Sequence, residues 1–294
     1  GGKGTRLKEI SNDMPKPMVR ILGKPLLQHL IEQCVKYEFL DIKLLVSYKH
    51  EIIRDFFGDG SDYGVSIQYY VEDIPRGTAG ALLDILPNLN EQFMVLYGDT
   101  FFDIDLNAFW RFHRFKGGDI SIFLHPNDHP KDSDLIEIDS DLKVTNIHPY
   151  PHDSQWRRNL VNAALYIFNK KSLRGVSLKS KRPDIAKDLF PILLDFGRNI
   201  YGYLSTEYIK DMGTPNRLYK VERDITSGRV ESLRHKVRKI AVFLDRDGVI
   251  NQEIDHLSSL DEFNLIPGEG EAIRQANKEG ILVVVVTNQP VNAR

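Results

Sequence analysis

The spacing of apolar residues divides the chain into helical and extended segments. Between residues 25 and 37, apolar side chains recur at the repeat of a helix with one buried face. Residues 42–46 and 93–97 are nearly unbroken apolar runs, as in strands buried on both faces. Further helices are predicted at residues 52–57, 80–86, 185–194 and 214–223, and further strands at 65–71, 135–138, 143–147, 165–168, 201–209, 240–244 and 281–287. Strands alternating with helices indicate an α/β fold with a mixed, mostly parallel sheet.

A change in composition near residue 229 predicts a domain boundary. Residues 229–239 contain five basic residues and one acid, without interleaved aromatic residues. This pattern favours a solvated linker over a nucleic-acid-binding patch. We therefore predict a first domain at residues 1–226, a basic linker at 227–238 and a second domain at 239–294.

Both ends of the sequence fall inside predicted elements. The chain opens on a glycine-rich turn, and such turns normally follow a strand, which this sequence does not contain. The buried strand at 281–287 is followed by seven residues, too few to complete a parallel sheet. We therefore expect the first domain to lack its first strand and the second to be a truncated N-terminal part.

Composition and charge exclude several classes of protein. Lys+Arg 39 against Asp+Glu 41 gives a net charge of −2, so no overall basic field attracts nucleic acid or a membrane. The longest apolar run, residues 281–286, is far shorter than the ~20 residues of a membrane-spanning helix. The single cysteine, Cys34, excludes an internal disulfide. These features predict a cytoplasmic protein without nucleic-acid or membrane partners, and they leave open whether it forms a homo-oligomer.

Glycines, a lysine and two aspartates form a first candidate site. The turn at residues 1–7 has glycines suited to phosphate but matches neither the Walker nor the dinucleotide motif. Lys16 lies between two prolines, and a rigidly presented cation suits a polyphosphate. Asp99 follows one strand and Asp211 follows the segment 201–209, so both carboxylates are expected at the ligand-binding edge of the sheet. Because Mg²⁺ typically uses one or two carboxylates plus substrate phosphates, we predict a nucleotide site with Mg²⁺ as cofactor.

Six blocks in order resemble the sugar-1-phosphate nucleotidyltransferase family. The blocks are the turn Gly1 to Leu7 with Pro15-Lys16-Pro17-Met18, Gly77-Thr78-Ala79-Gly80-Ala81, Gly98-Asp99-Thr100, Val161-Asn162-Ala163, Lys187-Asp188 with Pro191, and Asp211-Met212-Gly213-Thr214-Pro215. Residues 56–60 and 98–106 are most similar to the heptose-1-phosphate guanylyltransferase branch. The resemblance implies a Rossmann-like, GT-A-like fold for the first domain.

The resemblance also implies a reaction. An oxygen of a sugar 1-phosphate attacks the α-phosphate of a nucleoside triphosphate in line, and pyrophosphate leaves; positioning and charge neutralisation drive such transfers. By resemblance, the nucleotide is contacted by Gly2, Gly4, Thr5, Gly77 and Thr78, and the catalytic residues are Arg6, Lys16 and Asp99. The resemblance also implies that Asp99 and Asp211 bind Mg²⁺ and that Asn162 and Lys187 contact the sugar phosphate. The expected partners are therefore the two small-molecule substrates.

Glu72 provides an independent argument about the base. It lies five residues before Gly77, where this family reads the base. An ionised carboxylate only accepts hydrogen bonds, and guanine presents two adjacent donors on one edge. Uracil and thymine present one donor flanked by carbonyl oxygens, which a carboxylate would repel. We therefore predict GTP as the nucleotide.

The sequence departs from the family pattern on the sugar side. Ala164 stands where the family usually has glycine, Ala186 where it has glutamate, and residues 148–151 lack its Glu-Lys-Pro. D-glycero-D-manno-heptose 1-phosphate is the predicted sugar substrate. Mannose 1-phosphate, glucose 1-phosphate and a non-catalytic nucleotide-sugar sensor remain alternatives.

A second candidate site opens the second domain. Asp245 and Asp247 follow an apolar strand, a spacing that lets one carboxylate attack phosphorus while the other protonates the leaving oxygen. The segment resembles the haloacid-dehalogenase (HAD) phosphatases, and residues 267–268 and 287–290 are similar to their histidinol-phosphate and heptose-bisphosphate branch. By resemblance Asp245 is the nucleophile, Asp247 the acid/base, both are metal ligands, and Thr287 and Asn288 bind phosphate.

This second site is expected to be inert in these residues. The later lysine and metal-binding acid of the superfamily would lie beyond Arg294. A phosphatase that produced a heptose 1-phosphate would supply the first domain's substrate. The sequence therefore predicts a bifunctional protein, and phosphatase activity as the dominant one in the intact protein is a further alternative.

Overall fold

The structure is a computed structural model that contains two compact units, residues 1–234 and 235–294, which are described separately. It describes residues 14–127, 129–153, 155, 157–237, 240–254, 257, 259–279 and 281–288. The predicted site residues Gly2, Gly4, Thr5 and Arg6 lie outside the described residues.

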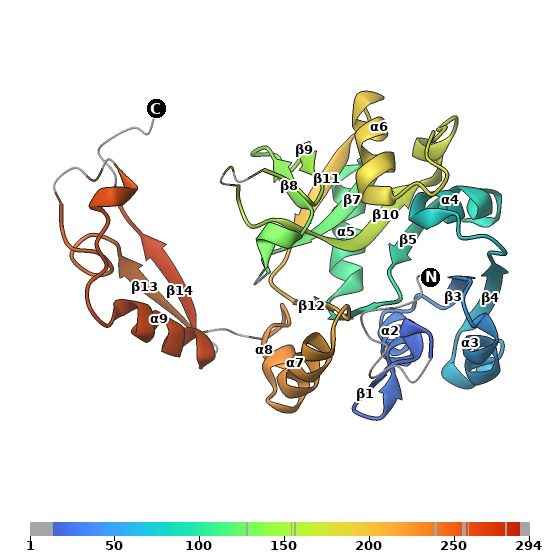
Figure 1. Cartoon of the computed structure of the whole chain (residues 1–294), viewed down its shortest axis with the longest axis horizontal. Coiled ribbons are helices and arrows are strands. Elements are labelled where there is room, and N and C mark those ends of the chain that lie inside the picture. The colour runs from blue at the N-terminus through green and yellow to red at the C-terminus, as the bar shows by residue number, and fades with distance from the viewer. Residues whose placement is uncertain are drawn as a thin grey trace. The chain divides into compact units, whose positions relative to one another are not determined.

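The main sheet of the first unit is mixed and centred on strand β10 (Figure 1). Its strands are β5 (Gln92–Leu96), β7 (Ile120–His125), β8 (Leu135–Ile138), β9 (Val144–His148), β10 (Val161–Asn169) and β11 (Ile200–Leu204). Strand β10 runs antiparallel to β5, β7 and β8, whereas β7 and β11 are parallel. A separate parallel pair joins β3 (Asp41–Val46) to β4 (Ser66–Val71). The predicted α/β fold class is confirmed, and β8 and β9 form the predicted hairpin.

Helices cover both faces of this sheet. Successive side chains of a strand point to opposite faces, so each face of β10 contributes to a different apolar core. Leu165 and Ile167 of β10 join one apolar core with α5 (Leu106–Lys116). Tyr166 and Phe168 join another core with α4 (Gly77–Ile85) and α6 (Phe190–Asp195). All four β10 side chains are at most 1% exposed. The alternation therefore fixes which helices pack on which face.

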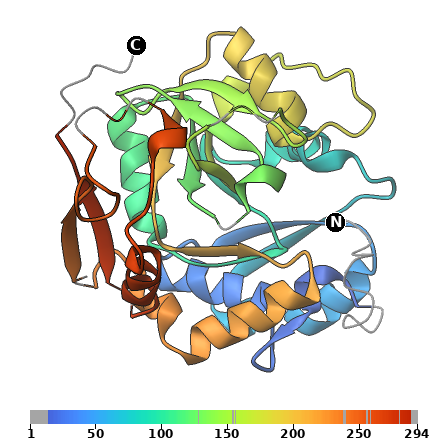
Figure 2. The same cartoon turned by 60° about the vertical axis from the view of Figure 1, so that its left-hand side comes forward.

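A third apolar cluster surrounds a two-stranded antiparallel sheet. Strands β6 (Thr100–Asp103) and β12 (Tyr208–Asp211) pair there. The helices of this cluster are α2 (Leu26–Lys36), α7 (Pro215–Thr226) and α8 (Arg229–Ser232). Both views place α7 beside β1 (Arg20–Ile21), and the backbone N–H of Leu22 donates to Glu222 (Figures 1 and 2). Short elements complete the unit: η2 (Lys16–Met18), β2 (Lys24–Pro25) and α3 (His50–Phe57).

The predicted single strand at residues 201–209 is wrong, because the structure has two strands there. Strand β11 belongs to the main sheet and β12 to the small one. Between them the carboxylate of Glu207, 3% exposed, accepts hydrogen bonds from the Ser205 hydroxyl at 3.2 Å and the Asp105 N–H at 3.1 Å. A buried carboxylate needs such donors, so the chain turns at Glu207 and leaves the main sheet.

Part of the predicted linker, residues 227–238, packs on the first unit. Val230 is buried in the third cluster. The Arg234 guanidinium contacts the Asp103 carboxylate at 2.8 Å through Nε and 2.6 Å through Nη2. Asp103 is 3% exposed, and Lys36 is its second cation at 3.4 Å. Through these contacts of Val230 and Arg234, residues up to 234 belong structurally to the first unit.

The second unit contains a parallel strand pair and a helix. Strand β13 (Ala241–Asp245) pairs with β14 (Leu282–Val286), and α9 is Glu269–Lys278. Phe243 and Val286 on these strands are 69% and 56% exposed. In the described parts of both units, none of the helices has the length and apolar character needed to cross a membrane.

Candidate functional site

Lys16 and Asp99 form an ion pair at the end of strand β5. The two residues are 83 positions apart, and Lys16 Nζ lies 3.1 Å from Asp99 Oδ2. Pro15 precedes the short helix η2 in extended conformation and fixes the backbone that presents the lysine. The two side chains are 24% and 38% exposed, so solvent and ligands can reach both. The structure thus brings the predicted cation and the predicted carboxylate together.

Asp211 approaches the same place from strand β12. It stands opposite Thr100 in the β6–β12 ladder, and the Met212 N–H donates to the carbonyl oxygen of Asp99 at 2.8 Å. The Asp211 carboxylate accepts a hydrogen bond from the Gly213 N–H at 3.2 Å and contacts the Arg217 guanidinium. The two predicted Mg²⁺ ligands therefore come from adjoining strand ends.

The donor set at Asp99 and Asp211 fits a divalent cation that is also bound by phosphates. Each carboxylate already forms an ion pair, Asp99 with Lys16 and Asp211 with Arg217, so each is oriented to bind a cation. No group of three or more histidine, cysteine or acidic side chains suited to a metal occurs in the described ranges. Mg²⁺ commonly takes one or two protein carboxylates and completes its octahedron with water and substrate oxygens. Asp99 and Asp211 are therefore the carboxylates that would hold the predicted Mg²⁺ together with substrate phosphates.

The predicted base-reading residue, Glu72, directly follows strand β4. Its Oε1 accepts the backbone N–H of Arg76 at 2.9 Å, which closes the loop that leads into α4. Its other carboxylate oxygen has no hydrogen bond to the described residues, and the side chain is partly exposed. One oxygen thus orders the loop while the other is free to accept from a ligand.

Thr78 connects the predicted nucleotide loop to the predicted sugar-phosphate segment. Its hydroxyl donates to Asp184 Oδ2 at 2.8 Å and accepts the N–H of Ile185 at 2.9 Å. Asp184 caps the single-turn π-helix η7 (Ile185–Leu189), which carries Lys187. The structure therefore places the Thr78 hydroxyl in a structural contact, whereas the sequence predicts a nucleotide contact.

On the sugar side, Lys187 and Asn162 both connect to Asp134. Lys187 Nζ donates to the carbonyl oxygen of Tyr150 at 2.8 Å, and the Tyr150 N–H donates to Asp134 Oδ1 at 2.8 Å. The Asn162 N–H donates to the Asp134 carbonyl oxygen at 3.0 Å. Burial raises the pKa of the Asp134 carboxyl. Asp134 is not among the residues predicted from the sequence, although its position just before the predicted strand 135–138 was an available signal.

The Tyr150 contact lies where the sequence departs from the family pattern. Residues 148–151, which lack the expected Glu-Lys-Pro, supply backbone groups to Lys187 and Asp134. Main-chain atoms thus meet the predicted sugar-phosphate lysine where the family pattern would place charged side chains.

His125 is a second residue that the sequence analysis missed. It ends strand β7, where burial, with a smaller contribution from Lys210, lowers its pKa to about 4. It therefore stays neutral at physiological pH. The Asp211 carboxylate acts on the pKa of His125 in the opposite direction.

Ala164 has the left-handed backbone conformation that favours glycine, with φ +56°. It lies in the irregular part of strand β10 between Asn162 and Tyr166. There Asn162 Oδ1 accepts the Ala164 N–H at 3.1 Å, and Asn162 Nδ2 donates to the Tyr166 hydroxyl at 3.0 Å. The family's glycine at this position thus has a physical reason: it orients the asparagine without strain.

We expect Ala164→Gly to stabilise the first unit by about 0.5–1 kcal/mol. Relief of the left-handed strain of an L-residue, about 1–2 kcal/mol, exceeds the added flexibility of glycine in the unfolded chain. Urea unfolding measures the change. The neighbouring Ala163→Gly, on a buried alanine without positive φ, should destabilise instead. A loss of stability in Ala164→Gly would contradict the prediction.

In the second unit, one sheet edge carries three of the predicted residues. Asp245 ends β13 opposite Val286, and Thr287 and Asn288 follow at the end of the neighbouring parallel strand β14. Asp247 is bound by the Arg246 guanidinium at 2.9 and 2.7 Å. The predicted nucleophile and phosphate ligands thus share an edge, while Asp247 is engaged by its neighbour.

Comparison with known families decides the classification of the larger unit. The family model described as nucleotidyl transferase matches residues 1–228. The chain belongs to the nucleotidyl transferase family. Lys16, Asp99, Asp211 and Lys187 all lie within the matched range. The HAD resemblance of residues 239–294 lies outside it.

Several relatives of this nucleotidyl transferase are named as enzymes that act on sugar 1-phosphates. The mannose-1-phosphate guanylyltransferase of Mycobacterium tuberculosis is 31% identical over 78% of the chain, which spans 63% of that relative's length. The D-glycero-alpha-D-manno-heptose 1-phosphate guanylyltransferase of Campylobacter jejuni is 34% identical over 62% of the chain and 78% of its own length. A crystal structure of HddC from Yersinia pseudotuberculosis, complexed with GMP-PN, is 28% identical with a TM-score of 0.64; the match covers 76% of this chain and 96% of that one.

Proposed function

We propose that the chain is a guanylyltransferase that joins GTP to D-glycero-D-manno-heptose 1-phosphate and releases pyrophosphate. The observation that carries the proposal is the Lys16–Asp99 ion pair, whose aspartate is joined through its backbone to the end of the strand that carries Asp211. A cation beside two carboxylates suits a triphosphate with its metal, and the family supplies the reaction class. The single cysteine, which is buried, supports the predicted cytoplasmic location.

The geometry supports an in-line transfer. In this proposal the Lys16 ammonium neutralises charge that develops on the reacting phosphate, and Lys187 holds the phosphate of the sugar so that one of its oxygens faces the α-phosphate. Asp99 and Asp211 would hold Mg²⁺, which supplies charge neutralisation on the triphosphate when bound. Lys187 would exchange its Tyr150 carbonyl contact for the sugar phosphate.

Two features support the substrates. One carboxylate oxygen of Glu72 is available to guanine's adjacent donors, and relatives of both sugar classes carry guanylyltransferase names. The similarity of residues 56–60 and 98–106 to the heptose branch favours heptose over mannose. The test is pyrophosphate release with GTP, ATP, UTP, CTP and dTTP against heptose, mannose and glucose 1-phosphates. Release with mannose 1-phosphate alone would replace the sugar, and binding without release would favour a nucleotide-sugar sensor.

Glu72→Gln should reduce kcat/KM for GTP by about tenfold to a hundredfold, the value of one charge-assisted hydrogen bond. The glutamine carbonyl can still accept the Arg76 N–H, so the loop should remain ordered. Activity with UTP should not fall, because the carboxylate repels the carbonyl oxygens of uracil and an uncharged amide does not. The matched control is Asp73→Asn, the neighbouring exposed acid. Equal losses with GTP and UTP would refute the role of Glu72 in base choice.

The second unit supports a further proposal, that it contributes the nucleophile of a HAD-type heptose-bisphosphate phosphatase. The observation behind it is the shared edge of Asp245 and Thr287. In this proposal Asp245 attacks phosphorus and Asp247 protonates the leaving oxygen. The test is phosphate release from a heptose bisphosphate by the purified protein, with Asp245→Asn expected to abolish it.

A further inference from the structure

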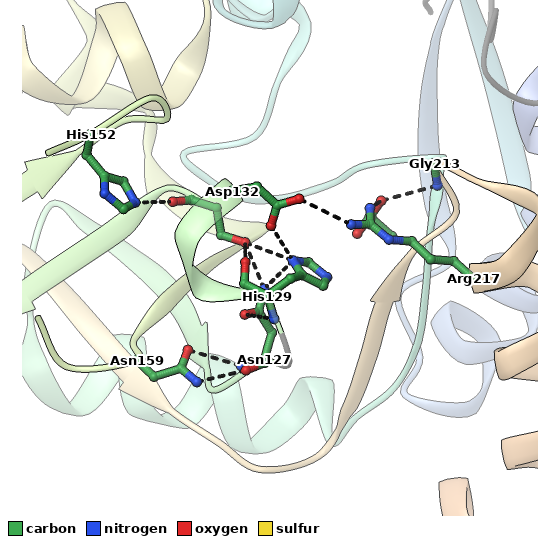
Figure 3. A network of polar contacts seen from close by, with 9 residues as sticks. Asn127, His129, Asp132, His152, Asn159, Gly213 and Arg217 are labelled. Atoms are coloured by element: carbon green, nitrogen blue, oxygen red, sulfur yellow. Dashed lines mark hydrogen bonds and ion pairs between the residues drawn. The ribbon is translucent and has the colours of Figure 1, made fainter. Parts of the chain in front are cut away.

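A polar network joins Asp211 to the loop after strand β7 (Figure 3). Arg217, in the first turn of α7, lies between two carboxylates. One guanidinium nitrogen contacts Asp211 Oδ1, and the other lies 3.8 Å from Asp132 Oδ2. A single guanidinium is therefore shared between a predicted metal ligand and an acid outside the proposed catalytic set.

Asp132 is held in place from its other side. Its Oδ1 lies 3.0 Å from His129 Nδ1, and the His129 N–H donates to Asn127 Oδ1 at 3.1 Å. Asn127 is in turn bound to Asn159: the Asn159 side chain donates to the Asn127 carbonyl oxygen at 2.8 Å and accepts its N–H at 3.2 Å. Figure 3 shows these residues on one side of Arg217 and Gly213 on the other. The loop thus presents an ordered carboxylate to Arg217.

The two contacts of Arg217 are unequal. It touches Asp211 closely and Asp132 only at ion-pair distance. A guanidinium and a divalent cation repel each other, so both cannot be tightly bound to Asp211 at once. The Asp132 carboxylate is 52% exposed, so a small movement of Arg217 would meet little obstruction there.

We propose that Arg217 is the resident counter-cation of Asp211 and that Asp132 receives it when a divalent cation binds. The inference rests on the proposed function, because that function places the divalent cation at Asp211. Asp132 is then a positioning residue that acts on metal affinity through Arg217.

The proposal predicts opposite effects for the two partners of the exchange. Without Asp132, Asp211 is the one ion-pair partner left to Arg217 among the described residues, so a metal must displace Arg217 without compensation and binds more weakly. Without the charge of Arg217, the metal meets an unopposed carboxylate and binds more tightly. In a variant that lacks the Arg217 guanidinium, no cation moves to Asp132 when the metal binds. Replacing Asp132 in that variant should therefore have little effect on metal affinity.

The experiment is a titration of the 294-residue chain with Mn²⁺ alone, in which the electron paramagnetic resonance signal measures free Mn²⁺. The variants are Asp132→Asn, Arg217→Gln, the double variant and Asp211→Asn. The matched control is Asp141→Asn, an exposed acid 2.7 Å from Lys116. Thermal melting of each variant checks that it folds.

We expect Asp132→Asn to raise the Mn²⁺ dissociation constant about threefold to tenfold and Arg217→Gln to lower it about threefold. The double variant should match Arg217→Gln, the control should match the unchanged chain, and Asp211→Asn should lose the site. Equal effects of Asp132→Asn with and without Arg217 would overturn the proposal, because Asp132 would then act only through long-range charge. Absence of Mn²⁺ binding at Asp211 in the unchanged chain would also overturn it.

Pyrophosphate release, measured in parallel, separates this inference from the proposed function. A chain that releases pyrophosphate but lacks the coupling overturns the exchange alone. A chain that shows the coupling but releases no pyrophosphate with any substrate pair overturns the proposed function and upholds the exchange.

Discussion

Asp99→Ala should reduce Mg²⁺-dependent pyrophosphate release by at least about a thousandfold, the scale of losing a principal electrostatic contact to a transferring phosphoryl group. Asp99 is the partner of Lys16 at 3.1 Å, and its backbone joins it to the strand end of Asp211. The substitution would remove a proposed metal ligand and leave the lysine without its counter-charge. Steady-state pyrophosphate release with GTP and heptose 1-phosphate, over a range of Mg²⁺ concentrations, measures the effect.

Stability should hardly change, because the Asp99–Lys16 pair is partly exposed and such pairs contribute about 0–1 kcal/mol. Asp141→Ala, which removes another exposed ion-paired acid of the same unit, is the control and should retain full turnover. Unchanged turnover in Asp99→Ala would contradict the assignment of this strand end as the catalytic centre.

Gly77→Ala should destabilise the first unit by about 2–4 kcal/mol, from left-handed strain plus overpacking. Gly77 has φ +75°, and a Cβ there would lie 2.4 Å from the carbonyl oxygen of Pro183 and 2.6 Å from the carbonyl carbon of Arg182. Both obstacles are backbone, so they cannot rotate away. The segment that would have to move leads into Lys187, so KM for the sugar phosphate should rise as well. Urea unfolding and substrate titrations measure the two effects.

Gly64→Ala is a matched control for this prediction. Gly64 has the same φ of +75°, but a Cβ there would have nothing within 4 Å. Its alanine variant should therefore show only the conformational cost, about 1–2 kcal/mol. If Gly77→Ala is no more destabilising than Gly64→Ala, the close approach to Pro183 does not contribute to the loss of unfolding free energy, which contradicts the prediction.

Local chemistry explains which features the sequence predicts well. An aspartate directly after an apolar strand must lie at the end of that strand, so Asp99 and Asp245 could be placed without a structure. Lys16 is predictable because its flanking prolines fix the backbone around it. The hairpin of β8 and β9 also follows from two apolar runs joined by a short polar turn.

Some elements escape prediction because a buried polar pair interrupts their apolar pattern. Helix α5 and strand β7 are absent from the predicted elements. His113 of α5 and Ser121 of β7 are 1% and 0% exposed and hydrogen-bond to each other at 2.9 Å. Burial lowers the pKa of His113, so it is held neutral in the core. The hydrogen bond between His113 Nδ1 and the Ser121 hydroxyl satisfies a polar atom of each residue inside the core, which single-residue patterns do not reveal.

By itself, the sequence determined the α/β class, the order of the motifs, the proline-fixed position of Lys16 and the place of Asp99 after strand β5, because these depend on residues close together in the chain. Tertiary structure decided where Asp211 lies, because Glu207 turns the chain out of the main sheet and β12 pairs with β6. It also decided that Lys187 meets Tyr150 and that Arg217 is shared with Asp132. Such contacts join segments far apart in sequence, and their energies depend on distances that only the folded chain fixes.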